Sequence, residues 1–175
     1  MGNLLSDVNY DDRDHWKMCL HEAAHAVIRS HYGGGGALIS EGFVSWIEGF
    51  GCDDSDTAMV HIAIAGYAAE AIVDPDGNSL ETLIFKLENE FEQAFLEHGG
   101  GIESDSQFVF RVIQRTRKTG RAQTRLLYKL ADETLAIVHT RWPQIESLAT
   151  KVRAKLLEES GDGVYYYSGL PDTLP

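Results

Sequence analysis

The chain has 175 residues, 43% of them hydrophobic and 24% charged, which is the composition of an ordinary globular protein rather than a disordered one. Its formal net charge of −12 favours solubility and repels nucleic acid on average, so we expect no nucleic-acid partner. The two cysteines, Cys19 and Cys52, have neither the number nor the spacing of a disulfide framework or a cysteine-based zinc site.

A chain of this length corresponds to one domain. We expect a single domain over residues 1–175, with its core at about 12–160 and a tail at 161–175. The most apolar stretch, 58–73, is too short to cross a membrane and contains His61 and Glu70. The N-terminal segment has no basic-then-apolar order of a signal peptide. We therefore expect a cytoplasmic protein without membrane contact.

The N-terminal third of the chain predicts one helix followed by strands. Residues 12–32 have a helical period, with apolar positions at steps of three and four: Trp16, Cys19, Ala23 and Val27. Four glycines at 33–36 end this helix. The next segment, 37–50, is apolar and bounded by glycines, so it predicts one or two short strands. We expect all the strand content of the protein there.

The remainder predicts further helices. The segment 56–74 predicts a helix whose alanines and one glycine, Gly66, would let a neighbouring helix approach closely, and 80–98 predicts a more polar helix. Ser104 and Gln107 have the spacing of a capping box at the start of a fourth helix. A long helix follows Gly120, with an interruption or restart expected at Pro143. The predicted fold class is mainly α, with at most a small β element near 37–50.

The strongest chemical signal is the pentapeptide His21-Glu22-Ala23-Ala24-His25. Two histidines four residues apart on a helix project from the same side, so both imidazoles can bind one Zn²⁺ ion. Glu22 lies next to the first histidine, where it can act as general base toward a zinc-bound water. The alternative is an incidental glutamate between two surface or core histidines.

A catalytic zinc site usually has three protein ligands, and the sequence offers several candidates for the third. Asp105 heads an apolar stripe, so its carboxylate could point inward, but it could equally be a first-turn acid favoured by the helix dipole. Glu70 lies on the packed face of its helix and could bind the ion or orient a ligand histidine. His61 and His98 are weaker candidates.

The segment 106–131 contains seven basic residues and no acidic one: Arg111, Arg115, Arg117, Lys118, Arg121, Arg125 and Lys129. Such a run is most often a solvated helix face, and the alternative is a docking surface for an acidic partner. Of its aromatic residues only Tyr128 lies among the basic ones, which is not the regular interleaving of stacking residues expected of a single-strand binder.

Three segments together resemble the peptidase domain of the FtsH-type ATP-dependent zinc metalloproteases. Residues 21–27 resemble its zinc helix, 65–73 its following helix with small residues before Ala-Glu, and 101–105 its small-residue element before an aspartate. The resemblance extends over about 15–159 and implies that Asp105 is the third zinc ligand. It also implies that Glu70 lies near the ion without binding it.

The sequence departs from that family in several respects. It has no glycine-rich phosphate-binding loop and no room for an ATPase module, so we expect no ATP binding. It also lacks the membrane helices of the full-length proteins, and 33–56 matches poorly.

We therefore expect a zinc-dependent metalloendopeptidase that hydrolyses peptides or unfolded proteins, the latter supplied by a separate ATPase. The substrate should bind as an added strand along 42–50. The alternative is a non-proteolytic, zinc-containing binding or regulatory module that retains the peptidase fold.

Overall fold

The structure is a computed structural model that describes residues 12–40, 42–46, 55–74, 79–97, 104–158 and 163–169. His98, residues 101–103 of the small-residue element and residues 47–50 of the predicted strand segment lie outside the described residues.

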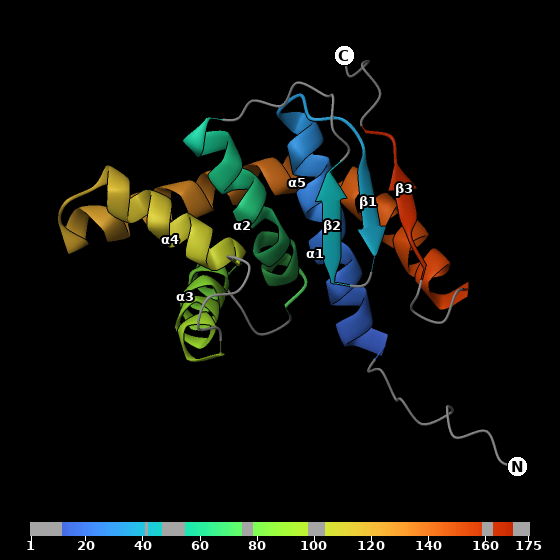
Figure 1. The fold of residues 1–175 in the computed structure, drawn as a ribbon, viewed down its shortest axis with the longest axis horizontal. Coiled ribbons are helices and arrows are strands. Elements are labelled where there is room, and N and C mark those ends of the chain that lie inside the picture. The colour runs from blue at the N-terminus through green and yellow to red at the C-terminus, as the bar shows by residue number, and fades with distance from the viewer. Residues whose placement is uncertain are drawn as a thin grey trace, which may run out of the picture.

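The described residues form five helices and a small antiparallel sheet, which confirms the predicted mainly α fold class (Figure 1). In chain order the elements are α1 (Asp12–His31), β1 (Ala37–Ser40), β2 (Phe43–Trp46), α2 (Asp56–Ile72), α3 (Ser79–Glu97), α4 (Asp105–Thr116), α5 (Gly120–Glu158) and β3 (Tyr165–Tyr167). None of these helices is long and apolar enough to cross a bilayer, within the part of the chain that the structure describes.

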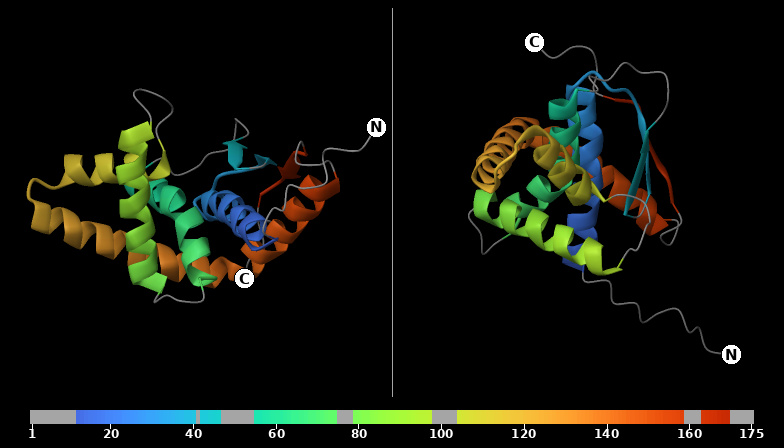
Figure 2. Two further views of the ribbon diagram at one scale, coloured as in Figure 1. Left: turned by 90° about the horizontal axis from the view of Figure 1, so that it is seen from below. Right: turned by 60° about the vertical axis from the view of Figure 1, so that its left-hand side comes forward.

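The alanine-rich helix α2 lies at the centre of the core, where it contacts α1, α3, α4 and α5 (Figure 2). Ser55 caps its first turn by accepting a hydrogen bond from the Ala58 amide at 3.3 Å. Most of its residues are buried, and small side chains such as Ala65 and Ala69 allow α1 to pack closely against it. This close packing brings the two motif histidines of α1 against α2.

The start of α4 is fixed by the predicted capping box. The Ser104 hydroxyl accepts a hydrogen bond from the Gln107 amide at 3.3 Å, and the Gln107 side-chain oxygen accepts one from the Ser104 amide at 3.0 Å. The two bonds pair backbone and side-chain groups that would otherwise lack partners at the helix end. They fix Asp105 as the first residue of α4, so its carboxylate lies at the N-terminal end of this helix.

The expected interruption of the long helix at Pro143 is wrong, because α5 continues without a break from Gly120 to Glu158. Proline inside a helix costs about 3 kcal/mol relative to alanine. Buried side chains on both sides of the proline, among them Val138, Ile145 and Leu148, pack on the core and hold the helix together across it. Tertiary packing here overrides the local signal.

The sheet has the strand order β2-β1-β3, and both pairs are antiparallel. The hairpin of β1 and β2 lies within the predicted strand segment, with Leu38 opposite Ser45. The expectation that strands are confined to that segment is wrong, because Tyr165–Tyr167 of the predicted tail pairs with β1. The edge of β1 offers unpaired backbone groups, and Tyr165 and Tyr167 pack against the core, so the tail forms a strand through contacts distant in sequence.

Candidate metal centre

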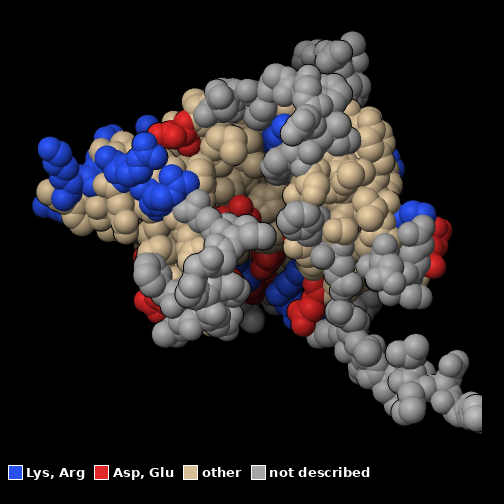
Figure 3. Space-filling model, viewed as in Figure 1, with Lys and Arg blue, Asp and Glu red and all other residues tan. Residues whose placement is uncertain are grey.

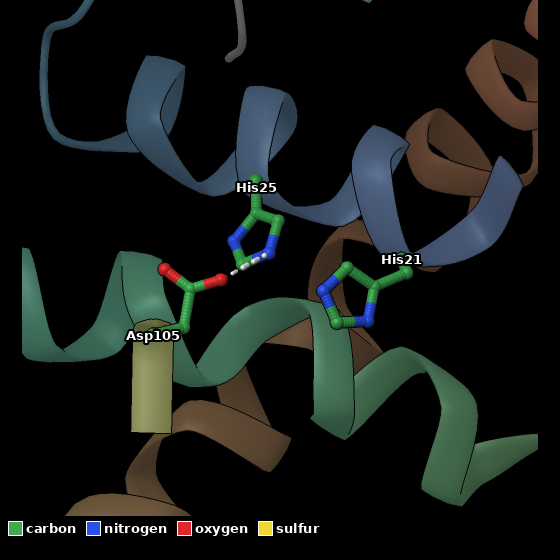
Figure 4. A group of neighbouring side chains, drawn as sticks. All are labelled: His21, His25 and Asp105. Carbon is green, nitrogen blue, oxygen red and sulfur yellow. Dashed lines mark ion pairs between the residues drawn. The ribbon is translucent and has the colours of Figure 1, made fainter. Parts of the chain in front are cut away.

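The motif histidines lie on the face of α1 that packs against α2. His21 and His25 are four residues apart, and their ring centroids are separated by 4.7 Å. Asp105 approaches them from the other side, at the first residue of α4 (Figure 4). Three side chains from two helices distant in sequence, α1 and α4, thus converge on one point, as the ligands of a metal centre must.

The ring of His25 is held from behind by α2. Its Nδ1 donates a hydrogen bond to the backbone carbonyl of Ile62 at 2.7 Å, because a carbonyl oxygen can only accept. The other ring nitrogen, Nε2, lies 3.2 Å from Oδ2 of Asp105. A metal-binding histidine usually donates a hydrogen bond from one ring nitrogen to a carbonyl or carboxylate, and the bond from Nδ1 leaves Nε2 of His25 for a metal ion.

The ring of His21 is held by a chain of charged groups. Its Nδ1 lies 2.6 Å from Oε1 of Glu70, and Oε2 of Glu70 accepts a hydrogen bond from the Lys86 ammonium group at 3.0 Å. Burial raises the pKa of Glu70, but the hydrogen bond and charge of His21, together with Lys86, bring it below its usual value. Glu70 is therefore an ionised carboxylate that accepts a hydrogen bond from Nδ1 of His21, which leaves Nε2 of His21 available as a ligand.

The three candidate ligand atoms lie within 4.8 Å of one another, and they form a possible metal-binding group. Ligands at about 2.0–2.1 Å from a tetrahedral Zn²⁺ are about 3.3 Å apart. His25 and Asp105 already have this spacing, at 3.2 Å, so a modest movement of the His21 ring would complete the set. Two imidazole nitrogens and one carboxylate oxygen are a known donor set of catalytic zinc, so the residues fit that ion.

The electrostatics of the metal-free cluster centre on His25 and Asp105. Burial lowers the pKa of His25, but the charge and hydrogen bond of Asp105, with smaller contributions from Glu22 and Ile62, raise it to about 9. Burial raises the pKa of Asp105, but His25 brings it below its ordinary value. A metal ion that bound through Nε2 of His25 would have to displace the proton of this ring.

Glu22 lies beside the ligand cluster and is only 7% exposed. Burial raises the pKa of its carboxyl group, although His21 and His25 act in the opposite direction. An open pocket of about 380 Å³ reaches this side chain, and its lining consists of Asp14, Lys17, Met18, His21, Glu22, Glu70 and Lys86. A buried carboxylate with a raised pKa at the end of a solvent-open pocket can accept and return a proton.

A glycine in α2 makes room for the His21 ring. A Cβ atom built on Gly66 would lie 2.4 Å from Nε2, 2.5 Å from Cδ2 and 2.6 Å from Cε1 of His21. Real Cβ contacts are almost never below 3.0 Å, so any larger residue would displace the ring. The absence of a side chain at Gly66 is therefore required for the position of His21.

Not every histidine considered as a ligand lies at the cluster. The Nδ1 atom of His61 lies 2.8 Å from the Thr134 hydroxyl, and its ring stacks on Tyr32 with centroids 6.0 Å apart. His61 is thus a buried histidine with partners of its own, away from the His21, His25 and Asp105 group.

The sequence predictions missed Lys86 and also Tyr67, whose ring packs edge-on against His21 at 5.0 Å, and they gave Gly66 a role in helix packing but none at the site. A glycine inside a helical pattern was the only available signal for Gly66. Lys86 is 16 residues from Glu70 and belongs to another helix, so no local pattern could have indicated it.

No family model, curated protein or solved structure matches this chain.

Proposed function

We propose that this chain is a zinc-dependent metalloendopeptidase, with His21, His25 and Asp105 as the metal ligands and Glu22 as the general base. The observation that carries the proposal is the convergence of the three ligand side chains beside a buried glutamate at a solvent-open pocket. The resemblance to FtsH-type peptidase domains, which rests on the sequence motifs, points in the same direction.

A Zn²⁺ ion at this position would lower the pKa of a water molecule and polarise the scissile carbonyl group. Glu22 would accept a proton from the attacking water and pass it to the leaving amine. Its burial supports this role, because a carboxyl group with a raised pKa is a better proton acceptor and donor near neutral pH. Glu70 and Lys86 would keep Nε2 of His21 directed toward the ion.

The strand β2 is the proposed binding edge for the substrate backbone. It pairs with β1 on one side, and its other edge carries no partner strand among the described residues. It also lies beside α1, the helix that carries the motif (Figure 1). An extended peptide bound there by main-chain hydrogen bonds would be recognised with little dependence on sequence. The substrates would be peptides or unfolded proteins, with any unfolding ATPase a separate protein.

The second candidate is a non-proteolytic zinc-binding module that retains this arrangement. Glu22 argues against it, because a purely structural zinc site has no use for a buried base beside the ligands. Structural zinc sites are also closed by a fourth protein ligand, and only three candidate ligands gather here among the described residues.

The test compares wild type with Glu22→Gln in zinc content and in hydrolysis of unfolded casein. We expect about one zinc per chain in both proteins and hydrolysis by wild type alone, because Glu22 is not a ligand. Hydrolysis by the variant at the wild-type rate would refute the mechanism. A zinc-loaded wild type that cleaves no unfolded substrate would favour the binding module.

A further inference from the structure

The outer end of the α4–α5 pair is strongly basic. The seven basic residues of segment 106–131 are all exposed, and they gather over the end of α4 and the start of α5 in Figure 3; we call this surface the basic arm. The other eight basic residues of the chain face 27 acidic ones, so the rest of the chain carries a formal charge of −19. The basic arm is therefore an exception within an acidic protein.

The charges of the basic arm repel one another in the isolated chain. Arg121 and Arg125 are four residues apart on α5, and like charges at this spacing destabilise a helix; Lys129, four residues further on, is offset by Glu133 at 3.7 Å. The first turn of α5 contains no acidic residue to offset them. An acidic surface bound to the basic arm would relieve this repulsion between basic side chains.

An acidic surface with matching spacing exists on α3 of the same chain. Its exposed side carries Glu81, Phe85, Glu88 and Glu92 at relative positions 0, 4, 7 and 11, which lie on one face of a helix. Phe85 is 69% exposed, the highest value among the exposed large hydrophobic residues of the described chain. We call this surface the α3 face. Aromatic side chains are enriched in protein interfaces, and the rim around them is polar.

We propose that two copies of this chain associate through the basic arm of one and the α3 face of the other, with the two helices antiparallel. Three contacts then fall in a single register: Glu92 with Arg121, Glu88 with Arg125, and Phe85 with Tyr128. The spacing agrees because each set extends over seven residues, or about 10.5 Å of helix. Tyr128 is itself 42% exposed, so the pairing buries an aromatic residue from each copy.

The register also defines where the contact ends. It places Glu81 opposite Asp132, a like-charge pair, so the favourable contacts stop after Phe85. Within one chain the two surfaces do not meet in this way, because α3 packs inward through Leu83 and Leu87 while its acidic side is exposed. Since each copy carries both surfaces, a symmetric dimer can form the contact twice.

A second copy explains the basic arm better than nucleic acid does. A long polyanion on the arm would approach the remaining −19 charge of the chain, whereas the α3 face brings only a few carboxylates, spaced to match. The charge pairs of this contact are exposed, so added salt should screen their attraction and weaken the association.

The experiment is sedimentation velocity of the full chain in low and high salt, with charge reversals. We expect wild type to dimerise at about 0.1 M salt, where the Debye length is about 10 Å, and to dissociate near 1 M, where it is about 3 Å. Arg125→Glu and Glu88→Arg should each weaken dimerisation at least tenfold. Lys151→Glu changes the net charge by the same amount as Arg125→Glu at another exposed position of α5, so it should dimerise like wild type.

The decisive measurement combines the two reversals. A chain carrying both Arg125→Glu and Glu88→Arg should dimerise again, and an equimolar mixture of the two single variants should form a heterodimer, because opposite charges then face each other in both contacts. A monomeric wild type at low salt would overturn the proposal, and so would a double variant that stays monomeric. Binding of polyglutamate or duplex DNA to the arm of a monomeric wild type would assign the arm to another partner and equally overturn it.

Discussion

The His21 ring occupies the space where a side chain at position 66 would lie, so a substitution of Gly66 tests the geometry of the site directly. In Gly66→Ala the new Cβ would lie 2.4 Å from Nε2 of His21, whereas ordinary contacts begin near 3.4 Å, so the ring must move by about 1 Å. The helix α2 cannot recede instead, because its neighbouring residues Ala65 and Ala68 are fully buried. The displaced ring would lose its 2.6 Å contact with Glu70 and the position of its ligand atom.

The magnitude separates zinc binding from folding. Alanine is favoured over glycine in a helix by about 1 kcal/mol, which partly offsets a lost hydrogen bond to a charged group worth about 1.5–3 kcal/mol. The free energy of unfolding of the metal-free protein should therefore fall by no more than about 2 kcal/mol. Changes in groups that support a ligand cost about 10–100-fold in metal affinity, so displacement of the ligand itself should cost at least about 100-fold.

The assay is competition for zinc with a chromophoric chelator, together with thermal unfolding followed by circular dichroism. Gly120→Ala is the matched control, because a Cβ at that position meets nothing within 4 Å, and its zinc affinity should equal that of wild type. A Gly66→Ala protein that binds zinc as tightly as wild type would refute the reasoning, since His21 could then bind without the space over Gly66.

Three further predictions concern the same site. Asp105→Ala should reduce zinc affinity steeply, and Glu70→Ala only by about 10–100-fold; the reverse order in chelator competition would identify Glu70 as the ligand. The metal-free protein should lose stability as pH rises from 6.5 to 9. The pKa of His25 is about 9 in the folded state and 6.5 ordinarily, so the protonated ring stabilises the fold fully below pH 6.5. This stabilisation is lost as the pH rises through 9. The loss is about 3 kcal/mol at most, and a pH-independent melting temperature of the metal-free protein would contradict it. A bound peptide should protect the amides of β2, Phe43–Trp46, from hydrogen exchange, and unchanged exchange there would exclude β2 as the binding edge.

Much of the fold was predictable because its signals are local. Three features were read from residues only a few positions apart in the sequence: the apolar spacing of α1, the alanine content of α2 and the capping box at Ser104. The same holds for the histidine pair, because four residues along a helix is a fixed geometric relation. Helical periodicity therefore predicted the elements and the two nitrogen donors of the candidate metal centre.

Features that depend on contacts between distant segments were not predictable in the same way. The strand β3 forms because β1 offers an open edge more than 100 residues earlier in the chain, and α5 stays continuous at Pro143 because the core holds both sides of it. Between Asp105 and Glu70, spacing alone left the third ligand open. The tertiary structure places Asp105 3.2 Å from Nε2 of His25 and Glu70 at Nδ1 of His21.

The sequence by itself determined which residue types are available for metal chemistry and which helix carries the two histidines. Only the tertiary structure decided which carboxylate faces Nε2, that Lys86 binds Glu70, and that Gly66 leaves space for an imidazole ring. The physical reason is the range of the interactions. Helix formation depends on neighbours within about four residues, whereas the orientation of a ligand ring depends on whichever helices the packed core brings against it.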